Sequence, residues 1–353
     1  MVNTVNIGTL KIGPKYPVRI KGMLKTSISK REALLEEANT LVKEGAEAIR
    51  VAIKYPHESQ ILKYLKSKIR VPFVADIHFN YKLAIEAIEC GFDGIRLNPL
   101  NITKEPQIKE VVKFAKKNGV HIRVGVNSGG FRQRLDEKNL AKNMVNSALN
   151  FIKILEKEDF FNISVSLKAS NIQTTILANR LFALRSKYPL HLGITATGPF
   201  LEGVIKSSLG IGILLEEGIG NILRVSLTGP SFWEIKIAKF ILQFLGLRYF
   251  EPEIVSCPTC SRCSVDLVKI VEDFYKKLDE LKSSSIKLPK KIAIMGCEVN
   301  GPGEAIFADI GIAFGNKRGV IFKKNKILCS DTVDNLAKKF IKILEEDNGY
   351  KRN

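Results

Sequence analysis

The chain of 353 residues has no long apolar run. No stretch approaches the roughly 18 consecutive apolar residues that a membrane-spanning helix needs, and the opening residues MVNTVNIGTLKIG lack the apolar core of a secretory signal. We therefore expect a cytoplasmic protein without a membrane partner. At 45% hydrophobic and 26% charged residues the composition is that of a globular protein. About 150 residues per domain predicts two domains, or one barrel of about 250 residues with an appendage.

Acidic residues are in short supply, because 36 Asp and Glu stand against 55 Lys and Arg, giving a formal charge of +19. The lysines are spread over the expected helices and form no basic arm, and RNA-binding signatures and aromatic residues between basic ones are missing. We therefore expect no nucleic-acid partner. A solvated Lys-rich surface is the preferred interpretation, with small phosphorylated ligands or an acidic protein partner as the functional alternative.

Cysteines are too few, at six, for a disulfide scaffold in a chain of this length. Three of them stand close together at Cys257, Cys260 and Cys263. In a reducing cytosol such a group indicates metal or redox chemistry. Cys90 and Cys329 stand apart, and we assign them no role.

Short β-rich segments alternate with amphipathic helical ones through the first 247 residues. Helices are expected at residues 29–45 and 234–246, among others, where apolar residues recur three and four apart. The expected strands are residues 18–21, 48–53, 71–75, 94–97, 121–126, 163–168, 190–195 and 222–227. Eight strand–helix repeats predict a TIM barrel, with a doubly wound open sheet as the main alternative.

Polar residues gather where these strands end, which is where catalytic groups of such barrels stand. They are Arg50, Asp76, His78, Arg96, Asn98, Arg123, Asn127, Lys168, Thr195, Arg224 and Ser226. A charge inside a barrel is costly unless it is paired or meets a ligand, so cations from several strands predict an anion site. Arginine forks together with a lysine suit a diphosphate. A single arginine at a strand end is more often a structural ion-pair partner, and His78 beside Asp76 is as compatible with a structural hydrogen-bonded pair as with an acid–base group. Lys206 is compatible with a helix surface charge, and Ser226 with a loop hydroxyl.

After Leu247 the pattern changes to a small α+β unit, so we place one domain at residues 1–247 and a second at 248–353. A strand at 253–256 runs into CPTCSRC, and a helix is expected at 265–283. A strand at 292–295 then precedes MGCEVNGPGEA, strands follow at 308–314 and 319–322, and a helix at 332–346 ends the unit.

Cysteine spacing in this unit predicts a metal site. Cys257-x2-Cys260 places two thiolates on one metal, and the Gly-rich segment after Cys297 lets the backbone approach an inorganic cluster. With Glu304 as fourth ligand an iron–sulfur cluster is favoured, since zinc prefers four cysteines or a mixture of cysteine and histidine. Zinc and free thiols remain alternatives, and Cys263 offers an all-cysteine set without Glu304.

Several segments in order, among them VADIHFNYKLA, IRVGVNSGG, EIVSCPTCSR and MGCEVNGPGEA, resemble the 4-hydroxy-3-methylbut-2-enyl diphosphate synthase family of the non-mevalonate isoprenoid pathway. The resemblance runs from about residue 5 to the last helix. It implies a TIM barrel followed by an iron–sulfur domain of ferredoxin-reductase-like type, with a [4Fe-4S] cluster on the ligands Cys257, Cys260, Cys297 and Glu304.

The family activity implied for this chain is the two-electron reductive ring opening of 2-C-methyl-D-erythritol 2,4-cyclodiphosphate with loss of water, fed by flavodoxin or ferredoxin. The resemblance assigns the diphosphate to Arg96, Arg123, Lys168 and Ser226, with Lys206 and His78 as further binding residues. It places Arg50 and Asn127 near the reacting hydroxyl, with Glu304 yielding to substrate oxygen at the cluster. A homodimer is also implied, in which the cluster of one subunit caps the barrel of the other.

One departure from the family pattern concerns proton supply. Where the family reads Thr-Glu-Ala-Gly, this chain reads Thr195-Ala196-Thr197-Gly198, so the acid that assists loss of the hydroxyl is missing. Loss of a general acid costs roughly 10² to 10⁴ in rate. Glu202 is a possible substitute, although it is expected to begin a helix.

Three hypotheses follow from these observations. The first is the pathway reductase itself. The second is a cluster-bearing, diphosphate-binding relative that is catalytically impaired or repurposed. The observation behind it is Ala196 in place of the family's glutamate. The third is an unrelated barrel enzyme acting on a phosphorylated metabolite, with a structural zinc in its second domain.

Overall fold

The computed structural model describes residues 2–131, 133–283, 286–297, 307–324 and 326–346. The chain divides into two compact units, Met1–Tyr249 and Phe250–Asn353. Glu304 lies outside the described residues.

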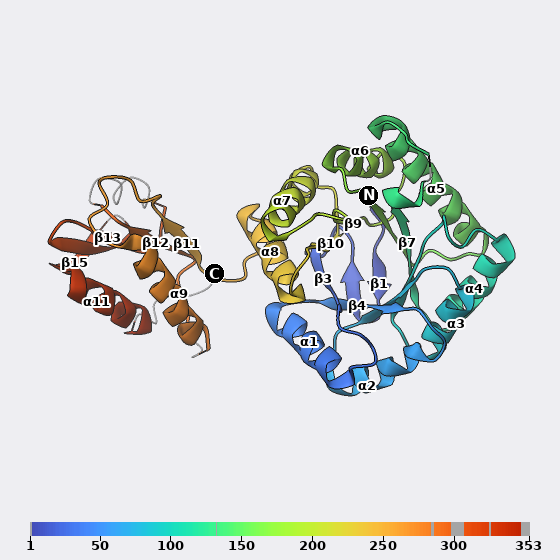
Figure 1. The fold of residues 1–353 in the computed structure, drawn as a ribbon, viewed down its shortest axis with the longest axis horizontal. Helices are drawn as coiled ribbons and strands as arrows, with labels where there is room; N and C mark the ends of the chain where they lie inside the picture. The colour runs from blue at the N-terminus through green and yellow to red at the C-terminus, as the bar shows by residue number, and fades with distance from the viewer. Residues whose placement is uncertain (1, 132, 284–285, 298–306, 325, 347–353) are drawn as a thin grey trace. The chain divides into compact units, whose positions relative to one another are not determined.

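The first unit is a barrel of parallel strands. The sheet order β8-β7-β6-β5-β4-β3-β10-β9 is closed by an isolated parallel bridge between Val165 and Leu190. The strands are β3 (Arg19–Met23), β4 (Ala48–Ile53), β5 (Phe73–Ile77), β6 (Gly94–Leu97), β7 (His121–Asn127), β8 (Ile163–Lys168), β9 (His191–Leu192) and β10 (Ile222–Leu223). Helices surround them as a ring (Figure 1). The expected TIM barrel is confirmed, and the open doubly wound sheet is excluded.

Eight helices of the ring alternate with these strands. They are α1 (Arg31–Glu44), α2 (Ile61–Lys68), α3 (Tyr81–Glu89), α4 (Glu105–Lys117), α5 (Glu137–Lys157), α6 (Ile172–Ala183), α7 (Phe200–Glu216) and α8 (Ser231–Phe244). Side chains of Asn80, Asp136 and Asn171 accept hydrogen bonds from backbone N–H groups of the first turns of α3, α5 and α6. Such caps satisfy donors that a helix cannot pair internally, which fixes where these helices begin.

An N-terminal hairpin, absent from the sequence expectation, precedes the barrel. β1 (Val5–Ile7) pairs antiparallel with β2 (Leu10–Ile12). Its buried side chains pack against Val74 and Ile222, which lie at or near the starts of β5 and β10. The hairpin therefore covers the end of the barrel opposite to the carboxyl ends of the strands.

The last two barrel strands are shorter than expected, with two residues each instead of six. After β9 the chain turns through Gly193, whose φ is +157°. A Cβ there would lie 2.4 Å from Lys168 Nζ and 2.5 Å from the Arg224 carbonyl oxygen, so only glycine fits this crowded point. The other six expected strands lie within about two residues of the observed ones.

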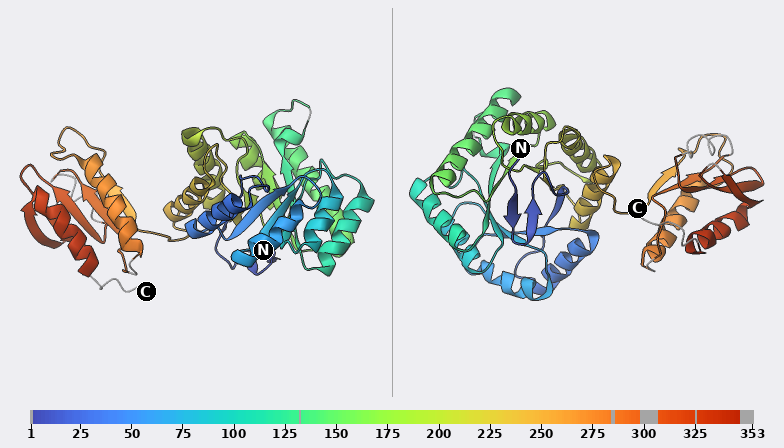
Figure 2. Two further views of the ribbon diagram at one scale, coloured as in Figure 1. Left: turned by 60° about the horizontal axis from the view of Figure 1, so that its bottom comes forward. Right: turned by 180° about the vertical axis from the view of Figure 1, so that it is seen from behind.

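The second unit is a five-stranded mixed sheet in the order β11-β12-β13-β14-β15. Its strands are β11 (Glu253–Ser256), β12 (Lys291–Met295), β13 (Ile310–Phe314), β14 (Arg318–Lys323) and β15 (Lys326–Thr332). α9 (Leu267–Ser283) and α11 (Val333–Glu346) pack one apolar face each on the sheet, and Figure 2 shows both on the same side. β15 was missed because KILCSDT is largely exposed and carries no clean alternation of apolar residues.

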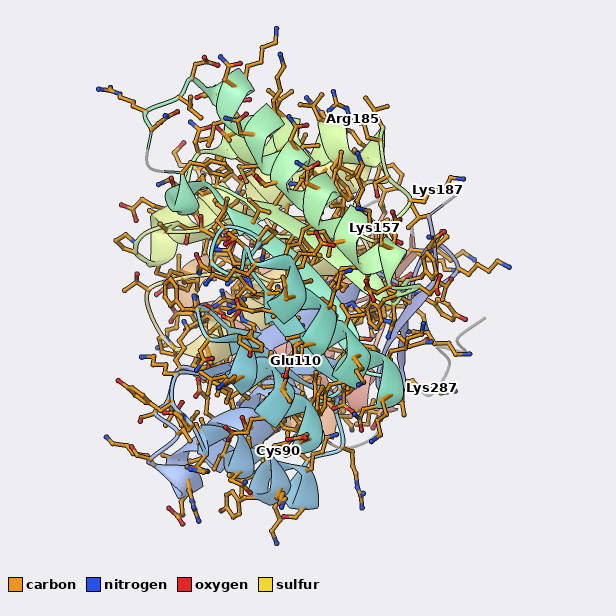
Figure 3. The ribbon with its side chains drawn as sticks, turned by 90° about the vertical axis from the view of Figure 1, so that its right-hand side faces the viewer. Cys90, Glu110, Lys157, Arg185, Lys187 and Lys287 are labelled. Atoms are coloured by element: carbon orange, nitrogen blue, oxygen red, sulfur yellow. The ribbon has the colours of Figure 1, made fainter. Side chains whose placement is uncertain are left out.

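Cationic side chains are distributed over the surface of the barrel unit. Lys157, Arg185 and Lys187 are exposed and project outward (Figure 3). Among the described residues, no helix has both the length and the apolarity to cross a bilayer.

Candidate active site

The interior of the barrel is lined by charged residues. Strand pairing places Asp76 opposite Arg96, and Arg96 opposite Arg123, at one level of β5, β6 and β7. Paired residues of neighbouring strands point to the same side of a sheet, so the three side chains share one face. Asp76, Arg96 and Arg123 are 4%, 3% and 1% exposed. Alternation along β4 and β8 puts Arg50 and Lys168 on that face as well.

Asp76 is the carboxylate at the centre of this group. Its oxygens lie 3.7 Å from Arg50 Nε, 3.6 Å from Arg96 Nη1 and 3.5 Å from His78 Nε2. Burial would raise the pKa of Asp76, but Arg50, the hydrogen bond from His78, Arg96 and Arg123 together hold that pKa well below its usual range. Asp76 is therefore ionised and pairs with some of the surrounding cations.

Arg123 lies deepest in the barrel interior. Its Nη1 donates to Nδ1 of His191 over 3.1 Å, and its Nε has no hydrogen-bond partner among the described residues. Burial first, and then repulsion from Arg50, Arg96 and Arg224, lowers the pKa of Arg123 well below its usual value. Burial and the nearby cations Lys168 and Arg123 likewise lower the pKa of His191. The imidazole of His191 is therefore neutral and serves as an acceptor.

Two buried lysines extend the cationic group. Lys168 is 5% exposed, and burial, followed by Arg123 and Arg224, lowers its pKa well below 10.5. Lys21, on β3, is 2% exposed, and within the described part of the chain its Nζ has no hydrogen-bond partner. Burial, followed by Arg123 and Arg50, lowers the pKa of Lys21 too. Sequence reasoning missed Lys21, although a lysine between apolar neighbours in a strand is the signal that identifies it.

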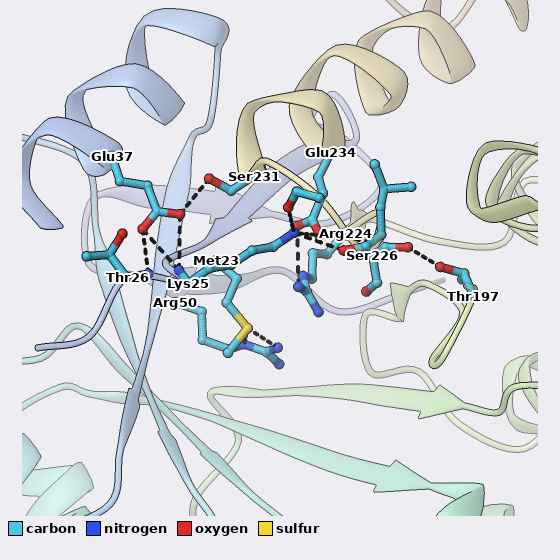
Figure 4. A network of polar contacts seen from close by, with 12 residues as sticks. Met23, Lys25, Thr26, Glu37, Arg50, Thr197, Arg224, Ser226, Ser231 and Glu234 are labelled. Atoms are coloured by element: carbon cyan, nitrogen blue, oxygen red, sulfur yellow. Dashed lines mark hydrogen bonds and ion pairs between the residues drawn. The ribbon is translucent and has the colours of Figure 1, made fainter. Parts of the chain in front are cut away.

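A second buried carboxylate, Glu234 of α8, joins the edge of the group. It lies 3.3 Å from Arg224 and 2.9 Å from Lys25. Glu37 accepts hydrogen bonds from the Lys25 and Thr26 backbone N–H groups and from the Ser231 hydroxyl. Figure 4 shows this network, which fastens the segment after β3 to the start of α8.

Positive charge exceeds negative charge at this site. Among the described residues, two carboxylates, Asp76 and Glu234, face Lys25 at the edge and six interior cations: Lys21, Arg50, Arg96, Arg123, Lys168 and Arg224. In these same ranges, nitrogens of Lys21, Arg123 and Arg224 have no hydrogen-bond partner. An unpaired buried cation costs free energy, so an anionic ligand stabilises the arrangement. The geometry of the barrel interior is that of an anion site.

The other residues expected at the site lie around its rim. Asn127 ends β7 and pairs in register with Lys168. Ser226 is half-buried, and its carbonyl oxygen accepts a hydrogen bond from the Thr197 hydroxyl (Figure 4). His78 has half of its side chain exposed. Lys206 is half-buried in the second turn of α7, outside the barrel strands that carry the interior cations.

Ala196 lies in the exposed loop after β9, with a φ of +50°. Glycine and asparagine favour this left-handed region, and a methyl side chain there transfers no proton. Glu202 is exposed in the first turn of α7, as expected. Its Cβ lies 3.9 Å from the position of a Cβ on Gly198.

The cysteines of the second unit stand at the carboxyl ends of two neighbouring strands. β11 and β12 are parallel partners, Cys257 follows β11 directly and Cys297 follows β12 after Gly296. The Gly296 N–H donates to Cys257 Sγ over 3.3 Å. Pairing of the two strands thus joins donors that are far apart in sequence. Cys260 is exposed in the loop between Cys257 and Cys263.

These residues fit an iron–sulfur cluster. A Cβ on Gly296 would lie 3.5 Å from Cys257 Sγ and 2.3 Å from Cys263 Sγ, so the backbone at Gly296 lies directly against soft sulfur donors. Thiolates with a closely approaching backbone are the surroundings that iron–sulfur clusters have in proteins. In the described ranges no group of three such donors is preassembled for a metal. Glu304, the fourth expected ligand, falls outside those ranges.

Both units match models of one protein family. The model described as the GcpE TIM-barrel domain matches residues 2–239, and the model described as the GcpE protein C-terminal domain matches residues 253–346. The chain belongs to the GcpE family. Members of this family are iron–sulfur enzymes.

Similar GcpE proteins share a name. The relative from Thermodesulfovibrio yellowstonii is 46% identical over 327 residues, covering 92% of each chain. That from Bacillus subtilis is 42% identical over 350 residues, covering 98% of this chain and 92% of its own. Both are named 4-hydroxy-3-methylbut-2-en-1-yl diphosphate synthase (flavodoxin), so the resemblance read from the sequence is confirmed.

Solved structures support the barrel of this GcpE protein. Dihydropteroate synthase from Stenotrophomonas maltophilia matches with a TM-score of 0.52 and 15% identity, covering 67% of this chain and 97% of its own. The dihydropteroate synthase from Xanthomonas albilineans matches with a TM-score of 0.53 and 11% identity, covering 70% of this chain and 99% of its own. At these identities the likeness shows the fold alone.

Proposed function

We propose that this protein catalyses the reductive ring opening and dehydration of 2-C-methyl-D-erythritol 2,4-cyclodiphosphate to 4-hydroxy-3-methylbut-2-enyl diphosphate. The observation that carries the proposal is the excess of buried cations inside the barrel of a GcpE protein. In this proposal residues 1–247 bind the diphosphate and residues 248–353 hold the cluster. A cytoplasmic enzyme of isoprenoid biosynthesis is the corresponding cellular role.

The cyclic diphosphate binds to the carboxyl ends of the barrel strands. Arg96, Arg123 and Lys168 supply the charge-assisted hydrogen bonds, and Ser226 adds a hydroxyl at the rim. His78 and Lys206 are further binding residues at the periphery. In a site that excludes water such bonds are strong, and the fixed strands already hold the donors in place.

Arg50 and Asn127 are placed near the hydroxyl that leaves. Arg50 is held beside Asp76, so its guanidinium keeps a fixed orientation. Asn127 at the end of β7 offers both a donor and an acceptor to a hydroxyl group. These two residues orient the reacting end of the substrate while the cations hold the diphosphate.

The cluster in this proposal is a [4Fe-4S] cluster held by Cys257, Cys260, Cys297 and Glu304. When bound it supplies electrons one at a time for the two-electron reduction. A carboxylate binds iron less strongly than a thiolate does, so Glu304 would be the most exchangeable of the four ligands and would leave one iron accessible to the substrate. The Cys257 thiolate is oriented by the Gly296 N–H, which fixes one corner of the site.

A second function is favoured by one observation, the alanine at position 196. A cluster-bearing protein that binds the diphosphate but reduces it slowly, or uses it as a signal, is consistent with a loop that carries no acid there. Ala196→Glu distinguishes the two functions. If proton supply limits the rate, the variant turns over about 10² to 10⁴ times faster, whereas Ala196→Gln, of the same size, does not.

Flavodoxin or ferredoxin is the proposed electron donor. The names of the relatives specify flavodoxin. The formal charge of +19 favours fast association with an acidic redox protein. Such association weakens steeply as salt is added, which stopped-flow reduction measures directly.

A homodimer is the proposed assembly. On α7 the large apolar side chains Leu201, Ile205, Leu209 and Ile213 are 39% to 66% exposed and recur every four residues, forming one stripe. A second copy of the chain covers this stripe in our proposal. Light scattering reports the mass, and Leu209→Glu yields monomers if the stripe is the interface.

Anaerobic turnover tests the proposed function. The protein is loaded with iron and sulfide to about four irons per chain, supplied with the cyclic diphosphate and a strong reductant, and followed by phosphorus NMR. Product formation at the rate of other family members supports the reductase. A loaded cluster with bound but unreduced substrate supports the impaired or repurposed relative instead, and zinc in place of iron contradicts both.

A further inference from the structure

Cys263 is a thiol that the family ligand set leaves unused. The run Cys257-x2-Cys260-x2-Cys263, with a distant fourth cysteine at Cys297, has the spacing by which bacterial ferredoxins bind a [4Fe-4S] cluster. Four thiolates in this chain thus reproduce an all-cysteine ligand set. The position of the Cys263 sulfur relative to Cys257 and Cys297 decides whether it can act as a ligand.

Cys263 Sγ packs directly against the backbone of Gly296. A Cβ on Gly296 would be 2.3 Å from this sulfur and 3.5 Å from Cys257 Sγ, so both sulfurs border the same point of the backbone, one residue before Cys297. Cys329 of the same unit instead sits on β15, opposite Ile321. Proximity to the cluster ligands is therefore a property of Cys263 and is not shared by every cysteine of the unit.

Backbone hydrogen bonds hold Cys263 in this place. The Cys263 N–H donates to the Cys260 carbonyl over 2.9 Å, and the Ser264 N–H donates to the Gly296 carbonyl over 3.1 Å. The loop is thus tied to the end of β12. The thiol itself donates only a weak hydrogen bond, to the Val265 carbonyl over 3.3 Å, and little is lost when that bond is given up.

We propose that Cys263 is an alternative fourth ligand of the cluster, which takes the iron of Glu304 when the carboxylate is absent or displaced. In this exchange the iron–oxygen bond breaks, the Cys263 thiol releases its proton to water, and an iron–sulfur bond forms without any change in oxidation state. Four thiolates leave no exchangeable position for substrate oxygen, so this form protects the cluster but is inactive. The inference rests on the proposed function, since it assumes the same cluster.

Thiol protection tests the proposal without an activity assay. Wild-type protein and Glu304→Ala are loaded with the cluster, treated anaerobically with iodoacetamide, and analysed by peptide mass spectrometry. In loaded Glu304→Ala, alkylation of Cys263 falls by about tenfold or more relative to loaded wild type, because a metal-bound thiolate is shielded. Removal of iron by a chelator restores the reaction. Cys329 is the internal reference and reacts equally in all samples.

A double variant provides the complementary measurement. Glu304→Ala with Cys263→Ser loses the fourth iron and shows the electron paramagnetic resonance spectrum of a three-iron cluster, whereas Glu304→Ala with Cys329→Ser keeps four irons. Equal alkylation of Cys263 in loaded wild type and loaded Glu304→Ala overturns the inference and leaves the proposed function intact. A wild-type chain that takes up no iron and sulfide overturns the proposed function together with it.

Discussion

The barrel interior and the cysteine loop prepare for their ligands in opposite ways. In the barrel, five strands and the residue after β10 bring six cations, from Lys21 to Arg224, close together before any anion binds. In the second unit, three of the sulfur donors belong to one short loop, and the fourth is added by the pairing of β11 with β12. Without its ligand the barrel interior is electrostatically strained, whereas the cysteine loop is not.

This difference shows where a rigid frame is required. Burial and mutual repulsion lower the pKa values of Lys21, Arg123 and Lys168, so the charged forms of these side chains are unfavourable in the ligand-free barrel. The hydrogen-bonded strands of the closed barrel hold the cations in place against this repulsion. Within its described residues the cysteine loop holds no such group of buried cations, so the positions of its sulfur atoms need only local hydrogen bonds and one strand contact. We therefore expect variants of the cysteine loop to affect iron binding, and variants of the barrel interior to affect both ligand binding and the free energy of unfolding.

The largest effect is expected at the cysteine loop. Replacement of both Cys257 and Cys260 by serine removes two thiolates, so iron and all reductive turnover are lost. Binding of inorganic diphosphate, measured by calorimetry, stays within about tenfold of wild type because the barrel supplies those contacts. Cys329→Ser retains iron and activity as the matched control. Parallel loss of diphosphate binding in the double variant would contradict the separation of the two sites.

The next effect concerns the strained barrel. Arg123→Met weakens diphosphate binding by about 2 to 5 kcal/mol, or roughly 30- to 4,000-fold. The same variant raises the free energy of unfolding of the ligand-free protein by about 1 to 4 kcal/mol, because it removes a buried and repelled cation. Calorimetry and urea unfolding measure the two quantities. Exposed Lys113 on α4 is the control, since Lys113→Met should change neither one. A loss of stability along with binding would mean that Arg123 is structural.

Stability of the ligand-free barrel should rise with pH. Burial, followed by Arg123 and Arg224, holds the folded pKa of Lys168 well below the value of 10.5 that it keeps when unfolded. Between these two values the unfolded chain binds more protons, so Lys168 makes the free energy of unfolding increase with pH by up to about 1.4 kcal/mol per unit. Urea unfolding between pH 7 and pH 10 measures this slope. Lys168→Met flattens it, and curves that run parallel in the two proteins would refute the assignment.

The smallest effect compares one glycine of each unit. Gly296→Ala places a Cβ 2.3 Å from Cys263 Sγ, so overpacking lowers the free energy of unfolding by about 1 to 3 kcal/mol and reduces cluster occupancy. Gly212→Ala, inside α7, raises stability by about 0.5 to 1 kcal/mol, since its new Cβ meets none of the described atoms within 4 Å apart from the neighbouring backbone of α7 itself. Thermal unfolding of both variants with and without iron provides the measurement. A stabilising Gly296→Ala would show that Cys263 does not pack closely against Gly296.

Sequence reasoning reached most of the barrel site because the signals were local. Arg50, Arg96 and Arg123 stand out as charges inside apolar strands, and alternation alone indicates which way they point. Lys21 carries the same signal but was missed, because it stood at the end of the expected strand 18–21 and was not recognised as an interior residue. His191 and Glu234 escaped since their importance lies in distant partners, Arg123 and Arg224. No local pattern encodes such a pairing.

The sequence by itself determined the eight strand–helix repeats, the cation-bearing strands, the cysteine spacing and the replacement at Ala196, because each of these is written in residue order. Tertiary structure alone decided that the hairpin covers one end of the barrel, that Lys21 joins the cationic group, and that Cys263 stands beside Gly296. The physical reason is the same in each case. Those contacts depend on closure of the barrel or on pairing of separate strands, and both join residues that the chain holds far apart.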